Sequence, residues 1–269
     1  MKLKTLPAAL AATLFVAAAA PAHAVSLTVR ITNLTSGFHF TPRLLVAHTA
    51  TAPGVPLFES GTAASADLIA IAEGGDTAPF TATLNADANN QTNMTFGGLV
   101  APAMTSADYT FETNDHPFLS LLTMLIPTND AFAGLSRWSI PTTPGTYTIN
   151  INAYDSGSEA NDEINSGNTA LTIADAGAFG GAPGRPGMAT PPPTQPNLNN
   201  GATGVAAQAA AGVLPVADIA NPNGGEGNVH IHRNTLGDGY PTAGRSDLNA
   251  TVHRWLNPVA RLTVIVPAS

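Results

Sequence analysis

The sequence predicts an all-β fold, an antiparallel β-sandwich. Short segments of alternating apolar and polar residues recur along the chain, and turn-forming Gly, Pro, Asn and Asp residues separate them. Clear helical spacing is confined to one segment. Many short strands with turns between them and little helix are typical of a sandwich.

The first 24 residues have the layout of a secretory signal peptide. Two lysines precede a continuous apolar run over residues 8–20, and small residues follow at Ala22 and Ala24. The run is shorter than the roughly 20 apolar residues that a membrane-spanning helix needs, and no later stretch is apolar enough to span a bilayer. We therefore expect cleavage after Ala24 and a secreted or periplasmic mature chain, residues 25–269, that forms one domain.

The charge of this expected mature chain excludes several partners. Cleavage would leave eight arginines, no lysine and 18 acidic residues, a formal charge of −10. Nucleic acid is therefore an improbable partner, and anionic membranes or sulfated glycans would need a bridging cation. Because the chain has no cysteine, its core or a metal must stabilise it in place of disulfides.

The N-terminal part begins with a half-buried strand, because every second position of residues 25–32 is apolar. A turn-rich crossing over residues 33–42 separates it from a short strand at 44–47. Residues 63–73 then have apolar side chains at helical spacing and end at two glycines, which predicts a short helix.

The middle and end of the chain return to strands. We expect three strands, each bounded by Gly, Pro, Asn or Asp, at residues 80–84, 92–96 and 109–112. The continuous apolar run at 118–126 suits a strand buried on both faces, although periodicity alone does not exclude a helix. Alternation resumes at residues 146–155 and 260–266.

A long insertion interrupts this pattern. Between about residues 175 and 227 the composition shifts to Gly, Pro, Ala and Asn. Such a segment has too few bulky apolar groups to offset its ordering entropy, so we expect a long mobile loop. Because strands resume after it, we interpret it as an insertion within one domain.

Acidic residues gather after two of the predicted strands. One group lies in a predicted turn, residues 127–134, and the other in residues 152–163. Loops at one end of a sandwich sit side by side, so Asp130, Asp155 and Glu159 could converge on Ca²⁺, which takes six to eight oxygen ligands. The alternative is that these acids are solvated turn residues. Neither segment matches the EF-hand pattern.

The same segments resemble the spondin N-terminal domain family. Residues 127–134 (PTNDAFAG) look like the family's P-S-P-D-W-F-x-G, and residues 153–159 (AYDSGSE) look like its P-Y-D-A-G-T-D. Residues 253–264 (HRWLNPVARLTV) are similar to the family's closing strand. Residues 29–40 and 58–61 are similar to its bacterial members.

This resemblance implies a sandwich of C2-like character that binds Ca²⁺. Carried over position by position, the implied ligands are Asp130, Asp155 and Glu159. In our own hypothesis, Asp162 or Glu163 is a more distant acid around the ion. The implied function is a non-enzymatic adhesion or ligand-binding module with an extracellular protein or glycan partner. The adhesive role is an analogy with the animal members of the family.

Several residues depart from the family's motifs, and three of these departures matter most. Alanine stands for tryptophan at Ala131, serine for alanine at Ser156, and glutamate for aspartate at Glu159. The glutamate keeps the charge but is one methylene longer, so it could hold an ion in a different position or with both oxygens.

A His-x-His segment supports a second hypothesis. On a strand, His230 and His232 would point to one face, and with His253 they could hold zinc or another transition metal in a cupin-like enzyme. No glutamate follows at the spacing that such an enzyme needs, so a surface or hydrogen-bonded pair is the alternative. The common hydrolase and phosphate-binding motifs are absent from the sequence. A purely structural protein is the third possibility.

Overall fold

The computed structural model describes residues 25–86, 89–126, 128, 130–158, 227–234 and 253–268. The expected signal peptide lies outside these ranges, and so does the predicted insertion except for its last residue. Within the described ranges, no helix has the length and apolar character needed to cross a membrane.

The described part of the chain contains ten strands and two helices. The strands are β1 (Ser26–Asn33), β2 (His39–Phe40), β3 (Arg43–His48), β4 (Gln91–Phe96), β5 (Tyr109–Glu112), β6 (Phe118–Ile126), β7 (Ala131–Ser139), β8 (Gly145–Asp155), β9 (His230–Ile231) and β10 (Ala260–Val266). The helices are α1 (Ala66–Gly74) and α2 (Ala78–Asn85).

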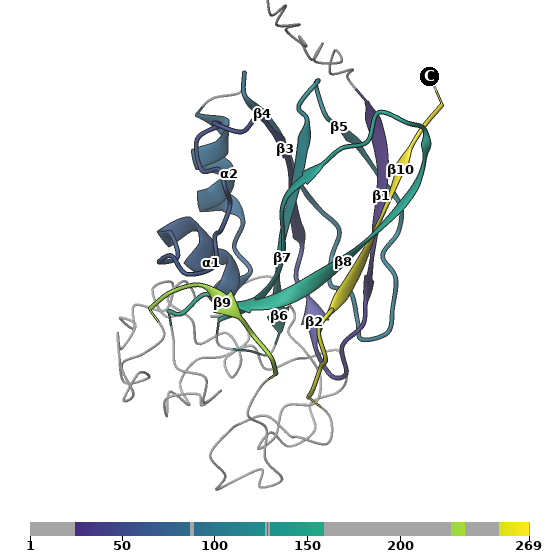
Figure 1. Ribbon diagram of the computed structural model, residues 1–269. Helices are drawn as coiled ribbons and strands as arrows, with labels where there is room; N and C mark the ends of the chain where they lie inside the picture. The colour runs from purple at the N-terminus through teal and green to yellow at the C-terminus, as the bar shows by residue number, and fades with distance from the viewer. Residues whose placement is uncertain are drawn as a thin grey trace, which may run out of the picture.

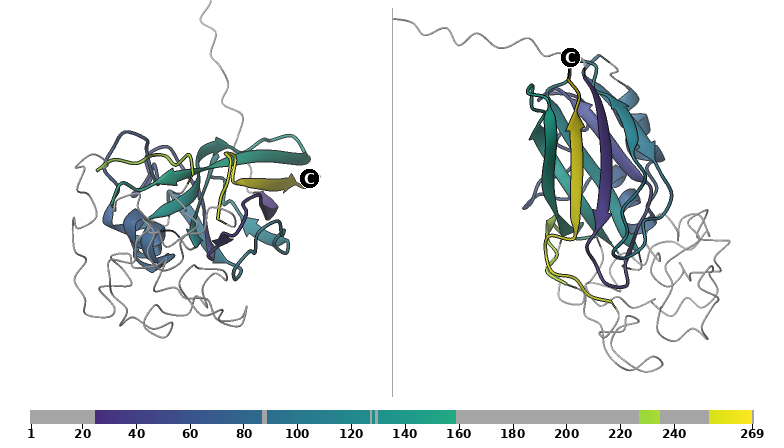
Figure 2. Two further views of the ribbon diagram at one scale, coloured as in Figure 1. Left: turned by 90° about the horizontal axis from the view of Figure 1, so that it is seen from below. Right: turned by 90° about the vertical axis from the view of Figure 1, so that its right-hand side faces the viewer.

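The strands form one antiparallel sheet that curls on itself. Its order is β4-β3-β6-β7-β8-β10-β1-β5, with β2 paired to β6 and β9 paired to β8 (Figure 1). Figure 2 shows β8, β10, β1 and β5 side by side in its right-hand view. The edge strands β4 and β5 meet through the rings of Phe96 and Tyr109, whose centroids are 4.6 Å apart. The sheet is therefore a nearly closed, sandwich-like barrel, which confirms the predicted all-β class.

The main hydrophobic core fills the inside of this barrel. The alternation predicted for β1 is confirmed, because Leu27, Val29 and Ile31 are fully buried while the residues between them are half-buried. Burying one such side chain contributes about 1.5–3 kcal/mol. The burial of the inward-facing side chains thus determines how each strand is aligned with its neighbours.

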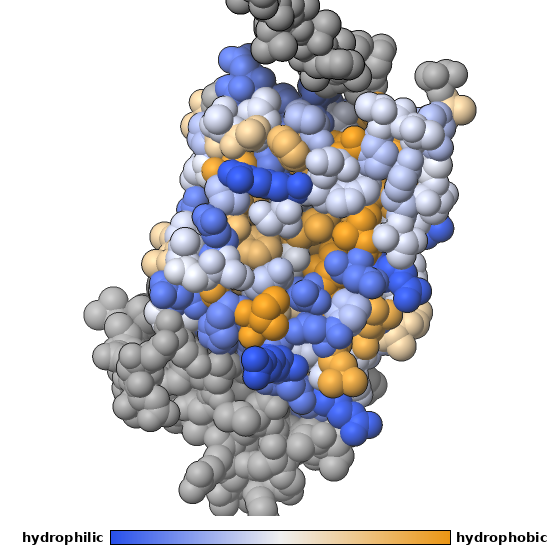
Figure 3. All heavy atoms as spheres, in the orientation of Figure 1, coloured by the Kyte–Doolittle hydropathy of each residue, from blue (hydrophilic) through white to orange (hydrophobic). Residues whose placement is uncertain are grey.

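The barrel is less tightly closed between β7 and β8. These strands pair only from Ala131 with Asp155 to Gly134 with Asn152. Beyond that point they diverge, and Figure 3 shows apolar side chains at the surface in the wedge between them. The partly buried side chains of Trp138 and Tyr147 pack here edge to face, with centroids 6.1 Å apart.

Two helices cover the outer face of β3, β6 and β7. They build a second hydrophobic cluster from side chains such as Leu68, Ile71, Phe80 and Leu84. This layer explains why β6 is buried on both faces, as predicted. Within β6, Leu121 faces the barrel interior, whereas its neighbour Leu122 belongs to the cluster beneath the helices.

Helix α1 confirms the helix predicted at residues 63–73. Ser65 is the N-cap, and its Oγ accepts a hydrogen bond from the Leu68 N–H at 3.2 Å. The helix ends at Gly75, whose φ of +65° is the left-handed conformation that glycine adopts without strain. A side chain here would also collide with Thr41, since a Cβ would lie 2.6 Å from Thr41 Cγ2.

The strand predicted at residues 80–84 is wrong, because this segment is helix α2. Phe80, Ala82 and Leu84 have the spacing of a strand face, but Phe80 and Leu84 alone have the spacing of one helix face. The structure buries Phe80 and Leu84 and exposes Ala82. A proline in the first turn also suits a helix start.

The turn predicted over residues 127–134 is also partly wrong, because strand β7 already begins at Ala131. Ala131, Phe132, Ala133 and Gly134 are buried on both faces, between the pairing partners β6 and β8. Short runs of small residues carry no period-2 signal, so the strand was not evident from the sequence. The turn proper ends at Asp130.

Candidate functional site

Two of the predicted acids lie at the joined ends of strands β7 and β8. Asp130 directly precedes β7, and Asp155 is the last residue of β8 and pairs with Ala131. Both aspartates are fully buried. Because a buried carboxylate needs donors or a cation, the local hydrogen bonds matter.

The loop after β8 folds back onto Asp130. Ser156 Oγ donates to Asp130 Oδ2 at 3.0 Å, and the Ser158 N–H donates to the same oxygen at 3.1 Å. The Ser156 N–H also donates to the Asp130 carbonyl at 3.3 Å. These bonds hold the β8 loop against the turn before β7, so the two acidic segments are in direct contact.

Helix α1 adds a third buried acid, Glu73, which the sequence reasoning missed. Its Oε1 accepts a hydrogen bond from Ser158 Oγ at 2.6 Å, and its Oε2 has no hydrogen-bond partner among the described residues. The side chain is fully buried. The available signal was a charge in the last turn of a mostly apolar helix whose other charged residue, Asp67, lies in the first turn. Glu73, Ser158, Asp130 and Ser156 are here named the carboxylate cluster.

The electrostatics of the carboxylate cluster are unfavourable without a cation. The pKa of Glu73 is raised to about 8, chiefly by burial and also by the nearby charge of Asp130, although the Ser158 hydrogen bond acts in the opposite direction. Two carboxylates sharing one serine in a dry environment cannot both ionise at low cost. A bound cation would remove this repulsion.

The side chain of Asp155 is not part of the carboxylate cluster and lies instead near His230 of β9 and near His232, which follows β9. Its Oδ1 accepts from the Gly157 N–H at 2.7 Å. Its Oδ2 lies 3.6 Å from His232 Nε2 and 3.9 Å from His230 Nε2. The two imidazoles therefore share one face, with His232 buried and His230 partly exposed.

The closing segment of the chain holds His232 in place. The His232 N–H donates to the Ala153 carbonyl at 3.0 Å, and Trp255 Nε1 donates to the His232 carbonyl at 3.2 Å. The rings of His232 and Trp255 meet edge to face, with centroids 5.0 Å apart. His253 is buried and packs against Phe38, with ring centroids 5.4 Å apart.

The structure thus separates the predicted site residues into groups. Asp130 belongs to the carboxylate cluster, Asp155 faces His230 and His232, and the ring of His253 lies against Phe38. The remaining predicted acids, Glu159, Asp162 and Glu163, lie outside the described residues. Among the residues that are described, no three His, Asp or Glu side chains form a group that could hold a metal ion.

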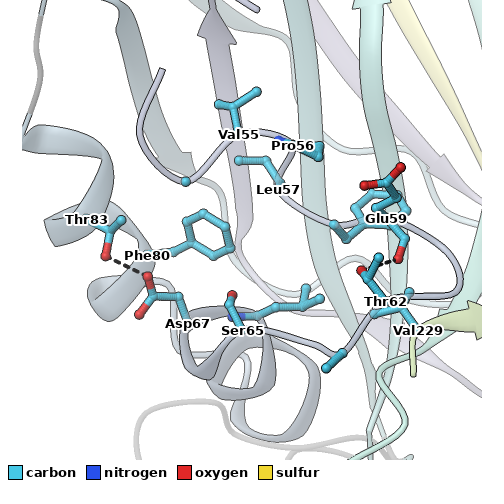
Figure 4. Close-up of a pocket in the computed structure, with 14 residues that line it drawn as sticks. Val55, Pro56, Leu57, Glu59, Thr62, Ser65, Asp67, Phe80, Thr83 and Val229 are labelled. Carbon is cyan, nitrogen blue, oxygen red and sulfur yellow. Dashed lines mark hydrogen bonds between the residues drawn. The ribbon is translucent and has the colours of Figure 1, made fainter. Parts of the chain in front are cut away.

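A surface pocket of about 330 Å³ lies between the loop at residues 54–63 and the two helices (Figure 4). Buried apolar side chains, among them Leu57 and Phe80, form part of its lining. Two acids, Glu59 and Asp67, line it as well, and none of the described residues that line it is basic.

One wall of this pocket is connected to strand β9, which contains His230. Val229 lines the pocket and directly precedes β9. Its carbonyl accepts from the Gly61 N–H at 2.8 Å, and its N–H donates to the Thr62 carbonyl at 2.8 Å. Figure 1 shows β9 close to α1 at the end of β8. Val229 thus connects the pocket wall to the strand that pairs with the end of β8.

Comparison with known protein families identifies one family. The model of the Spondin_N family matches residues 33–176, which is more than half of the chain. The match includes Glu73, Asp130 and Asp155. No curated protein sequence matches the chain. The chain belongs to the Spondin_N family.

Proposed function

We propose that this chain is an exported, non-enzymatic module of spondin type that binds Ca²⁺ and presents a ligand-binding or adhesive surface. The carboxylate cluster would take part in holding the ion. Asp155 and Glu159, which the family motif suggests as ligands, and the more distant Asp162 and Glu163 extend the acidic segment after β8. The partner would be an extracellular protein or a glycan.

The buried carboxylate of Glu73 carries this proposal. It is fully buried, its Oε2 has no hydrogen-bond partner in the part of the chain that the structure describes, and Ser158 links it to a second buried acid, Asp130. The oxygens available here are carboxylate and hydroxyl oxygens, the hard donors that Ca²⁺ prefers. When bound, the ion would supply positive charge that offsets the repulsion between the carboxylates.

The expected location favours the same ion. A secreted or periplasmic chain can meet Ca²⁺ at the roughly 10⁻⁴–10⁻³ M that extracellular modules are tuned to bind. The formal charge of −10 expected after signal cleavage also attracts divalent cations and repels anionic partners.

The ligand surface would lie at the end of the barrel where the loops meet. The β8 loop contacts both Glu73 and Asp130, and β9 joins Asp155 to the pocket wall at Val229. An ion held at the carboxylate cluster would order the β8 loop, and with it the neighbouring surface.

A calcium titration followed by thermal unfolding tests the proposal. A ligand that binds only the folded state at about 100 times its Kd stabilises it by about 2.7 kcal/mol, so we expect the Tm to rise by several degrees. Asp130→Asn and Glu73→Gln should remove most of the rise. Glu112→Gln, which neutralises an exposed acid on β5, is the matched control and should keep it. An unchanged Tm of the parent at about 5 mM Ca²⁺ would overturn the proposal.

A further inference from the structure

The seam between the edge strands β4 and β5 contains a buried arginine. Arg43, the first residue of β3, is 1% exposed and is among the largest fully buried side chains. Its guanidinium lies over the ring of Phe96, with Cζ 4.9 Å from the ring centroid. One terminal nitrogen donates to the carbonyls of Gly98 and of Thr41, the latter at 3.3 Å.

This arginine has no acidic partner among the described residues. By contrast, the partly exposed Arg30 of β1 pairs with Asp108 at 3.0 Å. The Nε of Arg43 is buried and has no hydrogen-bond partner in the described part of the chain. A buried cation is costly unless it is paired with an anion, and the groups around this one are neutral: backbone carbonyls, the Phe96 ring and the Tyr109 hydroxyl. Burial accordingly lowers the pKa of Arg43.

Arg43 lines a pocket of about 290 Å³ that the loop at residues 98–107 encloses. This volume is near the lower end of the range for small-molecule sites, about 300–1,000 Å³. Two apolar side chains, Leu99 and Met104, form part of its mouth and are 37% and 57% exposed. Tyr109 closes the other side, and its hydroxyl interacts favourably with the guanidinium.

We propose that this pocket binds a small organic carboxylate, whose anionic group pairs with Arg43 and whose apolar part lies against Leu99 and Met104. The planar guanidinium fork matches a carboxylate. A single cation in an acidic chain favours a singly charged anion over a doubly charged phosphate. The apolar side chains of Leu99 and Met104 favour a ligand with an aliphatic or aromatic substituent over a bare inorganic ion.

Hexanoate and 1-hexanol are suitable probes, because they share the aliphatic chain and differ in the charged group. In isothermal titration with the full mature chain and a chelator present, we expect hexanoate to bind at least about tenfold more tightly than 1-hexanol, a difference of about 1.4 kcal/mol. The chelator makes the result independent of the proposed calcium site. No hexanoate binding at about 10 mM, or equal binding of the two probes, would overturn the proposal.

Two variants locate the site. Arg43→Met removes the charge and should weaken hexanoate binding at least about tenfold. Because that variant could fail to fold, Ala107→Trp blocks the pocket from its exposed rim while leaving the arginine in place, and should abolish binding. Ala82→Trp, on the exposed face of α2, is the matched control and should bind like the parent. Hexanoate binding that survives Ala107→Trp contradicts the proposed site.

Discussion

Ser158 Oγ donates a hydrogen bond to Glu73 Oε1 at 2.6 Å, which joins the loop after β8 to the end of helix α1 across 85 residues of sequence. The N–H of the same serine donates to Asp130 Oδ2 at 3.1 Å. One small loop residue therefore connects two buried acids, and the properties of this connection can be measured.

The first prediction concerns the pH dependence of stability when a chelator removes calcium. The pKa of Glu73 is raised from 4.5 to about 8 in the folded protein, so between these values the unfolded chain loses a proton that the folded protein keeps. The stabilisation is full below about pH 4.5 and is lost as the pH rises through about 8. Each unit of pKa difference corresponds to about 1.4 kcal/mol.

Glu73→Gln keeps the shape of the side chain but cannot ionise. Urea unfolding at pH 5 and pH 8 should therefore show a smaller fall in the free energy of unfolding for this variant than for the parent. Glu112→Gln, at an exposed position, should behave like the parent. Parallel profiles for Glu73→Gln and the parent would contradict the assignment of this pH dependence to Glu73.

The second prediction concerns the packing of β7 against the aromatic cluster. A Cβ added at Gly134 would lie 2.7 Å from Phe58 Cε1 and Cζ, so the ring would have to move. Phe58 is held by Phe132 and Tyr154, with centroids 5.1 Å and 4.7 Å away. Gly134→Ala should therefore destabilise the protein by about 1–3 kcal/mol in urea unfolding.

Gly145→Ala is the control for this substitution, because a Cβ there meets Tyr147 at an ordinary 3.6 Å. This strand glycine should tolerate alanine with little change in the unfolding midpoint. Equal effects of the two substitutions would show that the collision with Phe58 is relieved.

The third prediction concerns the start of α1. Ser65→Ala removes the side-chain acceptor of the Leu68 N–H and should cost about 1 kcal/mol of stability. Ser65→Asp retains an acceptor and adds a charge that suits a helix N-terminus, so it should restore the urea midpoint of the parent. If Ser65→Asp is as unstable as Ser65→Ala, the cap is not the cause.

The fourth prediction separates the proposed module from a cupin-like enzyme. Because the described residues contain no group of three metal-binding side chains, and the ring of His253 packs against Phe38, we expect His232→Ala to leave the zinc, iron and manganese content unchanged. Elemental analysis of purified protein measures this, with calcium loss in Asp130→Ala as the companion test. Loss of a transition metal with His232→Ala would favour the enzyme.

The sequence by itself determined most of the strands and one helix. Alternation identified β1, β8 and β10, because each has one face in the barrel interior. The C-terminal end of α1 was also evident from the sequence, since a left-handed residue follows the helix directly and glycine, here Gly75, suits that conformation. These features depend on residues that are near one another in the chain.

Only the tertiary structure decided the rest. Helix α2 has a spacing that fits either a strand or a helix, and packing against the second hydrophobic cluster selects the helix. The contacts between distant side chains were likewise not evident from the sequence. Ser158 joins Glu73 to Asp130, and Arg43 contacts a loop more than 50 residues away that encloses its pocket. Local periodicity reports which face of an element is buried. It carries no information about which distant side chain is buried beside it, because that depends on how the whole sheet curls.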